Sequence, residues 1–148
     1  MNIYETFDKL RYHHENEVVE FKKAENNFDF DDLGKYFSAL SNEANLRDKG
    51  FAWLVFGVHD KTREILGTSY KNSMKSLQKL KQDLSQHTTD NNTFREIYEL
   101  EVEGKRVLMF QIPAAPRGIP MAWQGHFYAR RGESLGALDM NKYEEIRS

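Results

Sequence analysis

The sequence contains no cysteine, which excludes disulfide bonds, thiolate metal sites and a cysteine nucleophile. No apolar run approaches the roughly 20 residues that a membrane-spanning helix needs. The first residues also lack the apolar core of a signal peptide. These absences together predict a cytoplasmic protein that does not contact a membrane.

The common nucleotide-binding and hydrolase signatures are missing as well. There is no GxxxxGK(S/T) phosphate loop, so this chain cannot be the ATPase of a P-loop enzyme. GxGxxG and GxSxG are also absent. All three prolines lie within residues 113–120, which predicts a stiff, irregular crossing there.

The net charge of −2 hides an uneven distribution. Residues 1–32 carry nine acidic side chains against four basic ones, whereas residues 105–131 carry five basic side chains and no acidic one. A phosphate backbone responds to the local patch rather than to the total charge. Nucleic acid is therefore a candidate ligand in spite of the negative total.

At 148 residues, with ordinary hydrophobic and charged fractions, the chain fits a single domain over residues 1–148. Intermixed helices and strands that include a hairpin predict an α+β fold with a mixed sheet flanked by helices. Apolar residues at helical spacing predict helices at 31–45 and 72–87. We also expect a short entry helix at 3–11 and a last helix from about Asn141. Apolar alternation or short apolar runs predict strands at 18–23, 51–58, around Ile65, 95–112 and 122–130.

Acidic side chains near two of these strands form a candidate metal site. Glu20 lies in the first strand and Asp60 follows the central strand, so both could reach one end of the sheet if the strands are neighbours. Glu15 joins them only from a bend, because a spacing of five puts it on the opposite face of a regular strand. Carboxylate oxygens suit Mg²⁺ or Mn²⁺, which activate water and clamp phosphates. The alternative is a solvated acidic edge with Glu20 paired to a lysine.

Basic side chains favour binding of nucleic acid. Lys71, Lys75 and Lys79 are spaced by four opposite the leucines of their helix, although such a stripe is commonly only a solvated face. Arg117 lies between two prolines on a loop that a ligand could reach. Arg130 and Arg131 stand next to aromatic residues, a mixture that suits bases and phosphates. Because a strand sends these two arginines to opposite faces, we expect at most one of them to be structural.

Four motifs, in order, resemble those of the Schlafen/Alba-type domain family. They are the E-x-E-x-x-E-F-K stretch at 15–22, the helix segment at 36–42, the G-V-x-D turn at 56–60 with the following Ile65-Leu66-Gly67, and the aromatic-R-x-G-x-S ending at 127–134. The resemblance implies a DNA- or RNA-binding domain that heads a longer transcriptional regulator or RecG-related helicase-like protein, with an ATPase or regulatory region beyond Ser148. In animal Schlafen proteins, the related fold includes a metal-dependent endoribonuclease that cleaves transfer RNA. Its three acidic residues match Glu15, Glu20 and Asp60 by position.

Some features depart from that family. Residues 42–50 form a longer, more charged segment where the family has N-T-x-G-G, and His59 replaces an acid that is common beside the aspartate. The animal nuclease uses two related lobes as a clamp. This chain has one such lobe, and a homodimer would complete the clamp.

Three functions therefore stay open. The favoured one is a nucleic-acid-binding module, and the others are a Mg- or Mn-dependent nuclease that uses Glu15, Glu20 and Asp60, and a protein-interaction or oligomerisation domain. Lys22 of the first motif joins the other basic residues as a contact in the favoured function. The full predicted set of nucleic-acid contacts is Lys22, Lys71, Lys75, Lys79, Arg117, Arg130 and Arg131.

Overall fold

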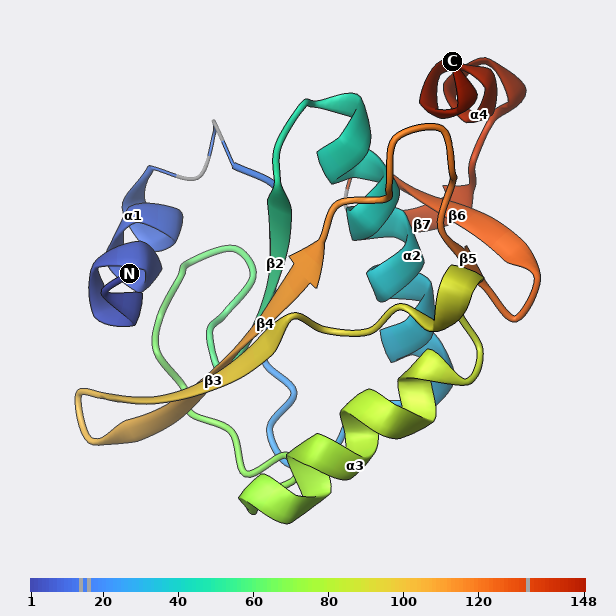
Figure 1. Cartoon of the computed structure of the whole chain (residues 1–148). Coiled ribbons are helices and arrows are strands. Elements are labelled where there is room, and N and C mark those ends of the chain that lie inside the picture. The colour runs from blue at the N-terminus through green and yellow to red at the C-terminus, as the bar shows by residue number, and fades with distance from the viewer. Residues whose placement is uncertain (14, 16, 133) are drawn as a thin grey trace.

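The computed structural model of the chain describes residues 1–13, 15, 17–132 and 134–148. Its helices and strands are intermixed in an α+β fold (Figure 1). The helices are α1 (Ile3–Tyr12), α2 (Phe30–Leu46), α3 (Met74–Ser85), the short 3-10 helix η2 (Thr89–Asn91) and α4 (Met140–Arg147). The strands are β1 (Val19–Lys22), β2 (Phe51–Phe56), β3 (Glu96–Val102), β4 (Lys105–Pro113), β5 (Ala122–Trp123), β6 (His126–Arg131) and β7 (Ser134–Ala137).

The α-helices begin where a polar side chain can accept hydrogen bonds from the first free amides. Asn2, Asp29, Ser73 and Asp139 each cap a helix in this way. The predicted helices are confirmed, with α3 somewhat shorter than the segment 72–87. Among the residues that the structure describes, no helix combines the length and the apolar character that crossing a membrane requires.

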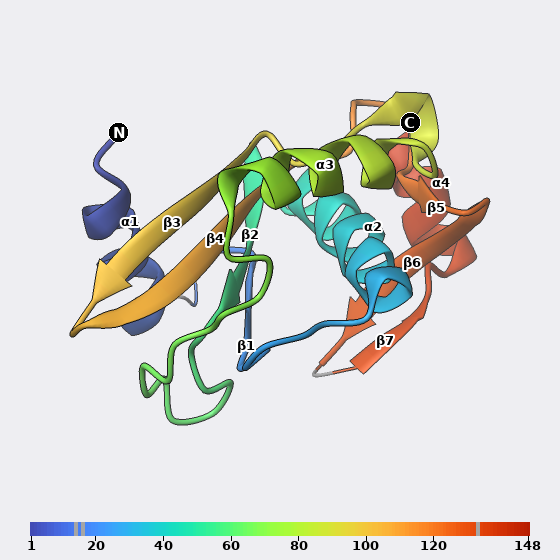
Figure 2. The ribbon, with the colours of Figure 1, turned by 90° about the horizontal axis from the view of Figure 1, so that it is seen from below.

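The larger sheet has the order β1-β2-β4-β3, with β1 parallel to β2 and the other neighbours antiparallel. Apolar side chains of α2 and α3 pack on one face of this sheet, and those of α1 pack on the other. Figure 2 shows these layers from below. The continuous apolar run of β2 follows from its central position, since both of its faces are covered. The predicted mixed sheet is thereby confirmed.

A second, antiparallel sheet has the order β5-β6-β7 and packs against α2. The sequence predicts one continuous strand over residues 122–130, and this is wrong. Trp123 pairs with His126 across a two-residue turn, in which Gln124 and Gly125 have φ angles of 49° and 81°. Left-handed conformations at both central positions are what a tight hairpin turn requires.

Polar side chains of α2 hold the second sheet in place. Asn42 is completely buried, accepts a hydrogen bond from the amide of Met121 at 2.7 Å, and donates to the carbonyl oxygens of Met121 and Tyr128 at 3.0 Å each. The hydroxyl of Ser38 donates to the Met121 carbonyl and accepts from the Tyr128 amide. The helix motif at 36–42 therefore fixes the position of β6, which carries the two candidate arginines.

Candidate functional site

A polar cavity of about 340 Å³ lies beside β1. Because β1 and β2 are parallel neighbours, their carboxyl ends lie at the same edge of the sheet, and the loop after β2 brings Asp60 to Glu20. The turn after β6 contributes Gly132. The residues that line the cavity are Val19, Glu20, Phe21, Lys22, Asp60, Arg63, Arg130 and Gly132.

Arg130 crosses from β6 to β1 and joins two carboxylates. Its Nη1 lies 3.0 Å from Oε1 of Glu20, and its Nη2 lies 2.6 Å from Oε2 of Glu43. Nη1 also donates to the carbonyl oxygen of Val19 at 2.7 Å. Burial lowers the pKa of the guanidinium, but the charge of Glu43 and the hydrogen bonds to Glu20 and Glu43 raise it overall. Arg130 is thus an internal ion-pair partner, and Glu20 pairs with this arginine, not with a lysine.

Lys22 is a half-buried cation inside the same cavity. Its Nζ lies 4.8 Å from the centre of the Tyr36 ring. Burial lowers its pKa, yet the Tyr36 hydroxyl and the negative charges of Glu20 and Asp60 outweigh this effect and raise the pKa above its ordinary value. Lys22 therefore stays protonated at neutral pH.

Arg63 supplies a further cation from the loop after β2. Its guanidinium stacks on the ring of Phe21, with Cζ 4.3 Å from the ring centre. In the described part of the chain, neither Lys22 nor Arg63 has a carboxylate oxygen within 4.0 Å. These two charges are available to an anionic ligand, whereas that of Arg130 is already compensated.

The structure brings together two of the three acidic residues that were predicted to bind a metal. Glu20 and Asp60 line one cavity, but Glu15 is exposed and does not line it, and its carbonyl oxygen accepts from Arg47 at 3.2 Å. One oxygen of Glu20 is held by Arg130. Within the residues described, the three acids do not form a group whose ligand atoms lie within 4.8 Å of one another.

Three other acids do form such a group at the start of α2, and it was not predicted. They are Asp29, Asp31 and Asp32. Asp29 caps the helix by accepting from the amide of Asp32, and Asp31 accepts from Nε1 of Trp123 at 2.8 Å. That hydrogen bond from Trp123 lowers the pKa of Asp31. Carboxylates here can offer oxygen ligands to a cation. However, Asp29 already caps the helix and Asp31 already accepts the hydrogen bond from Trp123.

The other predicted nucleic-acid contacts lie in separate places. Lys71 precedes α3 and Lys75 lies on it, and both are exposed; Lys79 pairs with Asp83 at 2.9 Å. Arg117 lies on the proline loop near α4. Figures 1 and 2 both show α3 and β6 well apart. Arg131 is exposed and lies next to the cavity residues Arg130 and Gly132, and it donates to the carbonyl oxygen of Ala137 at 3.0 Å.

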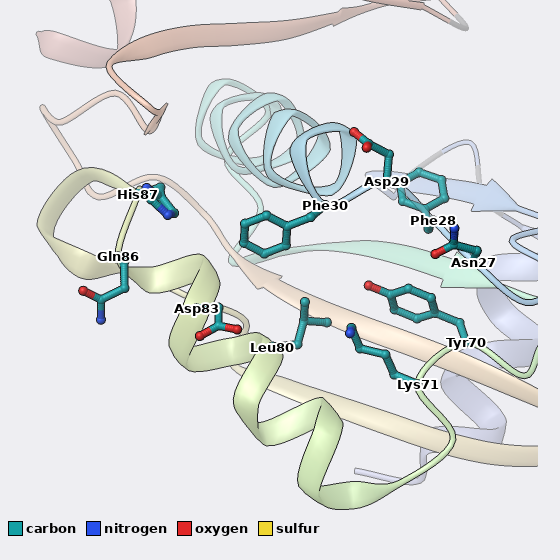
Figure 3. Close-up of a pocket in the computed structure, with 10 residues that line it drawn as sticks. All are labelled: Asn27, Phe28, Asp29, Phe30, Tyr70, Lys71, Leu80, Asp83, Gln86 and His87. Carbon is teal, nitrogen blue, oxygen red and sulfur yellow. The ribbon is translucent and has the colours of Figure 1, made fainter.

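A larger cavity, of about 570 Å³, lies between the start of α2 and the end of α3 (Figure 3). Of the predicted contacts, Lys71 alone lines it. No local pattern indicates this cavity, because isolated aromatic residues before a helix are commonly core residues and their partners lie far along the chain. The lining residues are Asn27, Phe28, Asp29, Phe30, Tyr70, Lys71, Leu80, Asp83, Gln86 and His87.

The fold and the β1 cavity define an α+β domain in which residues of three of the four motifs line one cavity. The chain belongs to the Schlafen AlbA_2 family, because the model of that family matches residues 15–139. This confirms the resemblance on which the sequence analysis relied. Asn16 and Glu133, which fall in two of the motifs, lie outside the described residues. A comparison with curated proteins found no significant match.

Solved structures that share the fold include two structural-genomics targets. The DIP2311 protein of Corynebacterium diphtheriae is 19% identical with a TM-score of 0.67, and the match covers 98% of this chain but 28% of that protein. The other is the N-terminal domain of a Nitrosomonas europaea protein that is named as related to the ATP-dependent DNA helicase RecG. It is 20% identical, with a TM-score of 0.52 and 88% of each chain covered. This chain therefore spans just over a quarter of the length of the Corynebacterium protein.

Proposed function

We propose that this chain is a cytoplasmic nucleic-acid-binding module, the N-terminal part of a longer regulator or helicase-like protein, and that it holds the sugar–phosphate backbone at the β1 cavity. The observation that carries the proposal is the pair of cations, Lys22 and Arg63, that line this polar cavity without a carboxylate partner among the described residues. Membership of the Schlafen AlbA_2 family and the likeness to a RecG-related domain support it.

The side chains of the β1 cavity have different roles, which depend on their surroundings. Lys22 and Arg63 offer positive charge to a phosphate, and the exposed Arg131 offers a further charge beside the cavity. Arg130 instead orients Glu20 and the β6 backbone through its ion pairs. Because phosphate contacts carry no base information, we expect little sequence preference from this cavity.

Removing one of these cations should weaken binding and its dependence on salt. For Lys22→Ala, we expect the slope of log K against log salt concentration to fall by about 1, since one phosphate contact is lost. Fluorescence polarisation with labelled single-stranded and duplex oligonucleotides over a range of salt concentrations measures both quantities. Lys142→Ala, an exposed lysine on α4, is the matched control and should leave the slope unchanged. Absence of binding by the wild-type domain at low salt would refute the proposal and favour a protein-interaction domain.

A second candidate function is metal-dependent cleavage of nucleic acid at the same cavity. It is favoured by the position of Glu20 and Asp60 together beside Lys22. Mg²⁺ or Mn²⁺ held there would activate water, with Glu15 as the third predicted ligand. Opening of the Glu20–Arg130 pair would free a carboxylate oxygen for the metal.

Cleavage of labelled transfer RNA and duplex DNA, with Mn²⁺ or with EDTA, tests this candidate. We expect Asp60→Asn to lower cleavage to the level measured in EDTA while binding is retained, and Asp90→Asn, an exposed control, to leave it unchanged. Full cleavage by Asp60→Asn would rule this metal site out. The homodimer that would complete a two-lobed clamp remains a prediction. The molecular mass of the domain in solution tests it.

A further inference from the structure

Aromatic side chains form the walls of the larger cavity (Figure 3). Phe28 and Phe30 come from the segment that enters α2, Tyr70 comes from the loop before α3, and His87 follows α3. Leu80 contributes an apolar surface from α3 itself. A volume of about 570 Å³ with aromatic walls suits a small planar ligand.

The hydroxyl of Tyr70 offers a polar group to a ligand in this cavity. The residue is 3% exposed, and Figure 3 shows its hydroxyl directed into the cavity. In the part of the chain that the structure covers, this oxygen makes no hydrogen bond to another protein group. Burial raises the pKa of Tyr70 to about 12, so the group stays protonated and can both donate and accept. The hydroxyl thus faces the cavity as a hydrogen-bonding group that a ligand can engage.

The charges around the cavity select a neutral ligand. Asp29 and Lys71 line it with opposite charges, and the charge of Asp83 is compensated by Lys79 at 2.9 Å. A phosphate group inside would therefore meet no excess of positive charge. The amide of the exposed Asn27 adds a donor and an acceptor near Tyr70 (Figure 3). A flat, uncharged ring with hydrogen-bonding edges satisfies these conditions.

We propose that this cavity receives one unstacked nucleobase of a single-stranded nucleic acid whose backbone is held at the β1 cavity. This inference rests on the proposed function and extends it to a preference for single strands. The side chain of Tyr36 connects the cavities. Its ring centre lies 4.8 Å from Nζ of Lys22, which lines the β1 cavity, and 6.1 Å from the ring of Phe28, which lines the larger one. The exposed Lys71 lines the larger cavity, where its charge is available to a neighbouring phosphate. Aromatic walls with nearby cations are the usual means of holding unpaired bases.

The test compares a labelled single-stranded oligonucleotide with an abasic strand of the same length, by fluorescence polarisation. The abasic strand keeps every phosphate, so it should retain the salt dependence but bind about tenfold more weakly. Tyr70→Phe and Asn27→Ala should each weaken binding of the intact strand about threefold to fivefold and leave binding of the abasic strand unchanged. Tyr98→Phe, which lies on the other face of the sheet, and Asn26→Ala, beside Asn27, are the matched controls.

The outcomes separate the two proposals. Equal affinity for intact and abasic strands would overturn the base-binding cavity and leave backbone binding standing. A base-dependent affinity that neither Tyr70→Phe nor Asn27→Ala alters would place the base elsewhere and overturn this inference as well. Failure of both strands to bind at low salt would instead contradict the proposed function itself.

Discussion

Arg130→Ala should lower the free energy of unfolding by about 3 kcal/mol, the lower end of the cost of removing one partner from a buried ion pair. The side chains of Arg130, Glu20 and Glu43 are 16%, 11% and 21% exposed. The change therefore leaves the poorly hydrated Glu20 without its cation and leaves Glu43 with the more distant Arg47, at 3.7 Å. It also removes the hydrogen bond to the carbonyl oxygen of Val19. Chemical denaturation of the purified domain at neutral pH measures the loss.

The neighbouring arginine provides the control for this prediction. Arg131 is exposed, and its guanidinium donates to the carbonyl oxygen of Ala137, so Arg131→Ala should change stability by less than about 0.5 kcal/mol. If nucleic acid contacts this face, the same variant should nevertheless weaken binding. Equal stability losses for the two variants would contradict the division between an internal Arg130 and an external Arg131.

Gly34→Ala should destabilise the domain although alanine is the better helix former. A Cβ at position 34 would lie 2.0 Å from Cε2 of Trp123, which is fully buried and held by its hydrogen bond to Asp31. The overpacking costs about 3 kcal/mol, against about 1 kcal/mol gained in helix propensity. We therefore expect a net loss of about 2 kcal/mol in the free energy of unfolding.

Gly50→Ala is the matched glycine, because a Cβ there would meet no heavy atom within 4 Å. Its free energy of unfolding should stay within about 0.5 kcal/mol of the wild type. If Gly34→Ala were as stable as Gly50→Ala, this result would contradict the direct packing of α2 on the second sheet.

Local patterns predicted most of the main fold. The apolar spacing locates α2 and α3, and the continuous apolar run at 51–58 indicates the central strand. The second sheet could not be predicted as well. Residues 122–130 alternate like one strand, and the turn that divides them depends on a left-handed Gln124 followed by Gly125. A non-glycine residue in that conformation gives a weak signal in a single sequence.

The β1 cavity was predictable to the extent that neighbouring parallel strands bring Glu20 and Asp60 to one edge. The ion pair between Glu20 and Arg130 joins residues 110 positions apart, and no local pattern specifies it. The same holds for the aromatic cavity, which Phe28 and Phe30 form with Tyr70 and His87. Such contacts depend on tertiary packing, while spacing reports only on one helix or strand at a time.

Mapping of amide chemical shifts by NMR, during titration of the domain with a short single-stranded oligonucleotide at low salt, tests the central claim most directly. We predict shifts in β1, in residues 59–63 and in the turn at 131–132. If a base enters the second cavity, the shifts should extend to residues 27–30 and to Tyr70 and Lys71. Shifts confined to α1 and α4, or no shift at all, would contradict nucleic-acid binding at the β1 cavity.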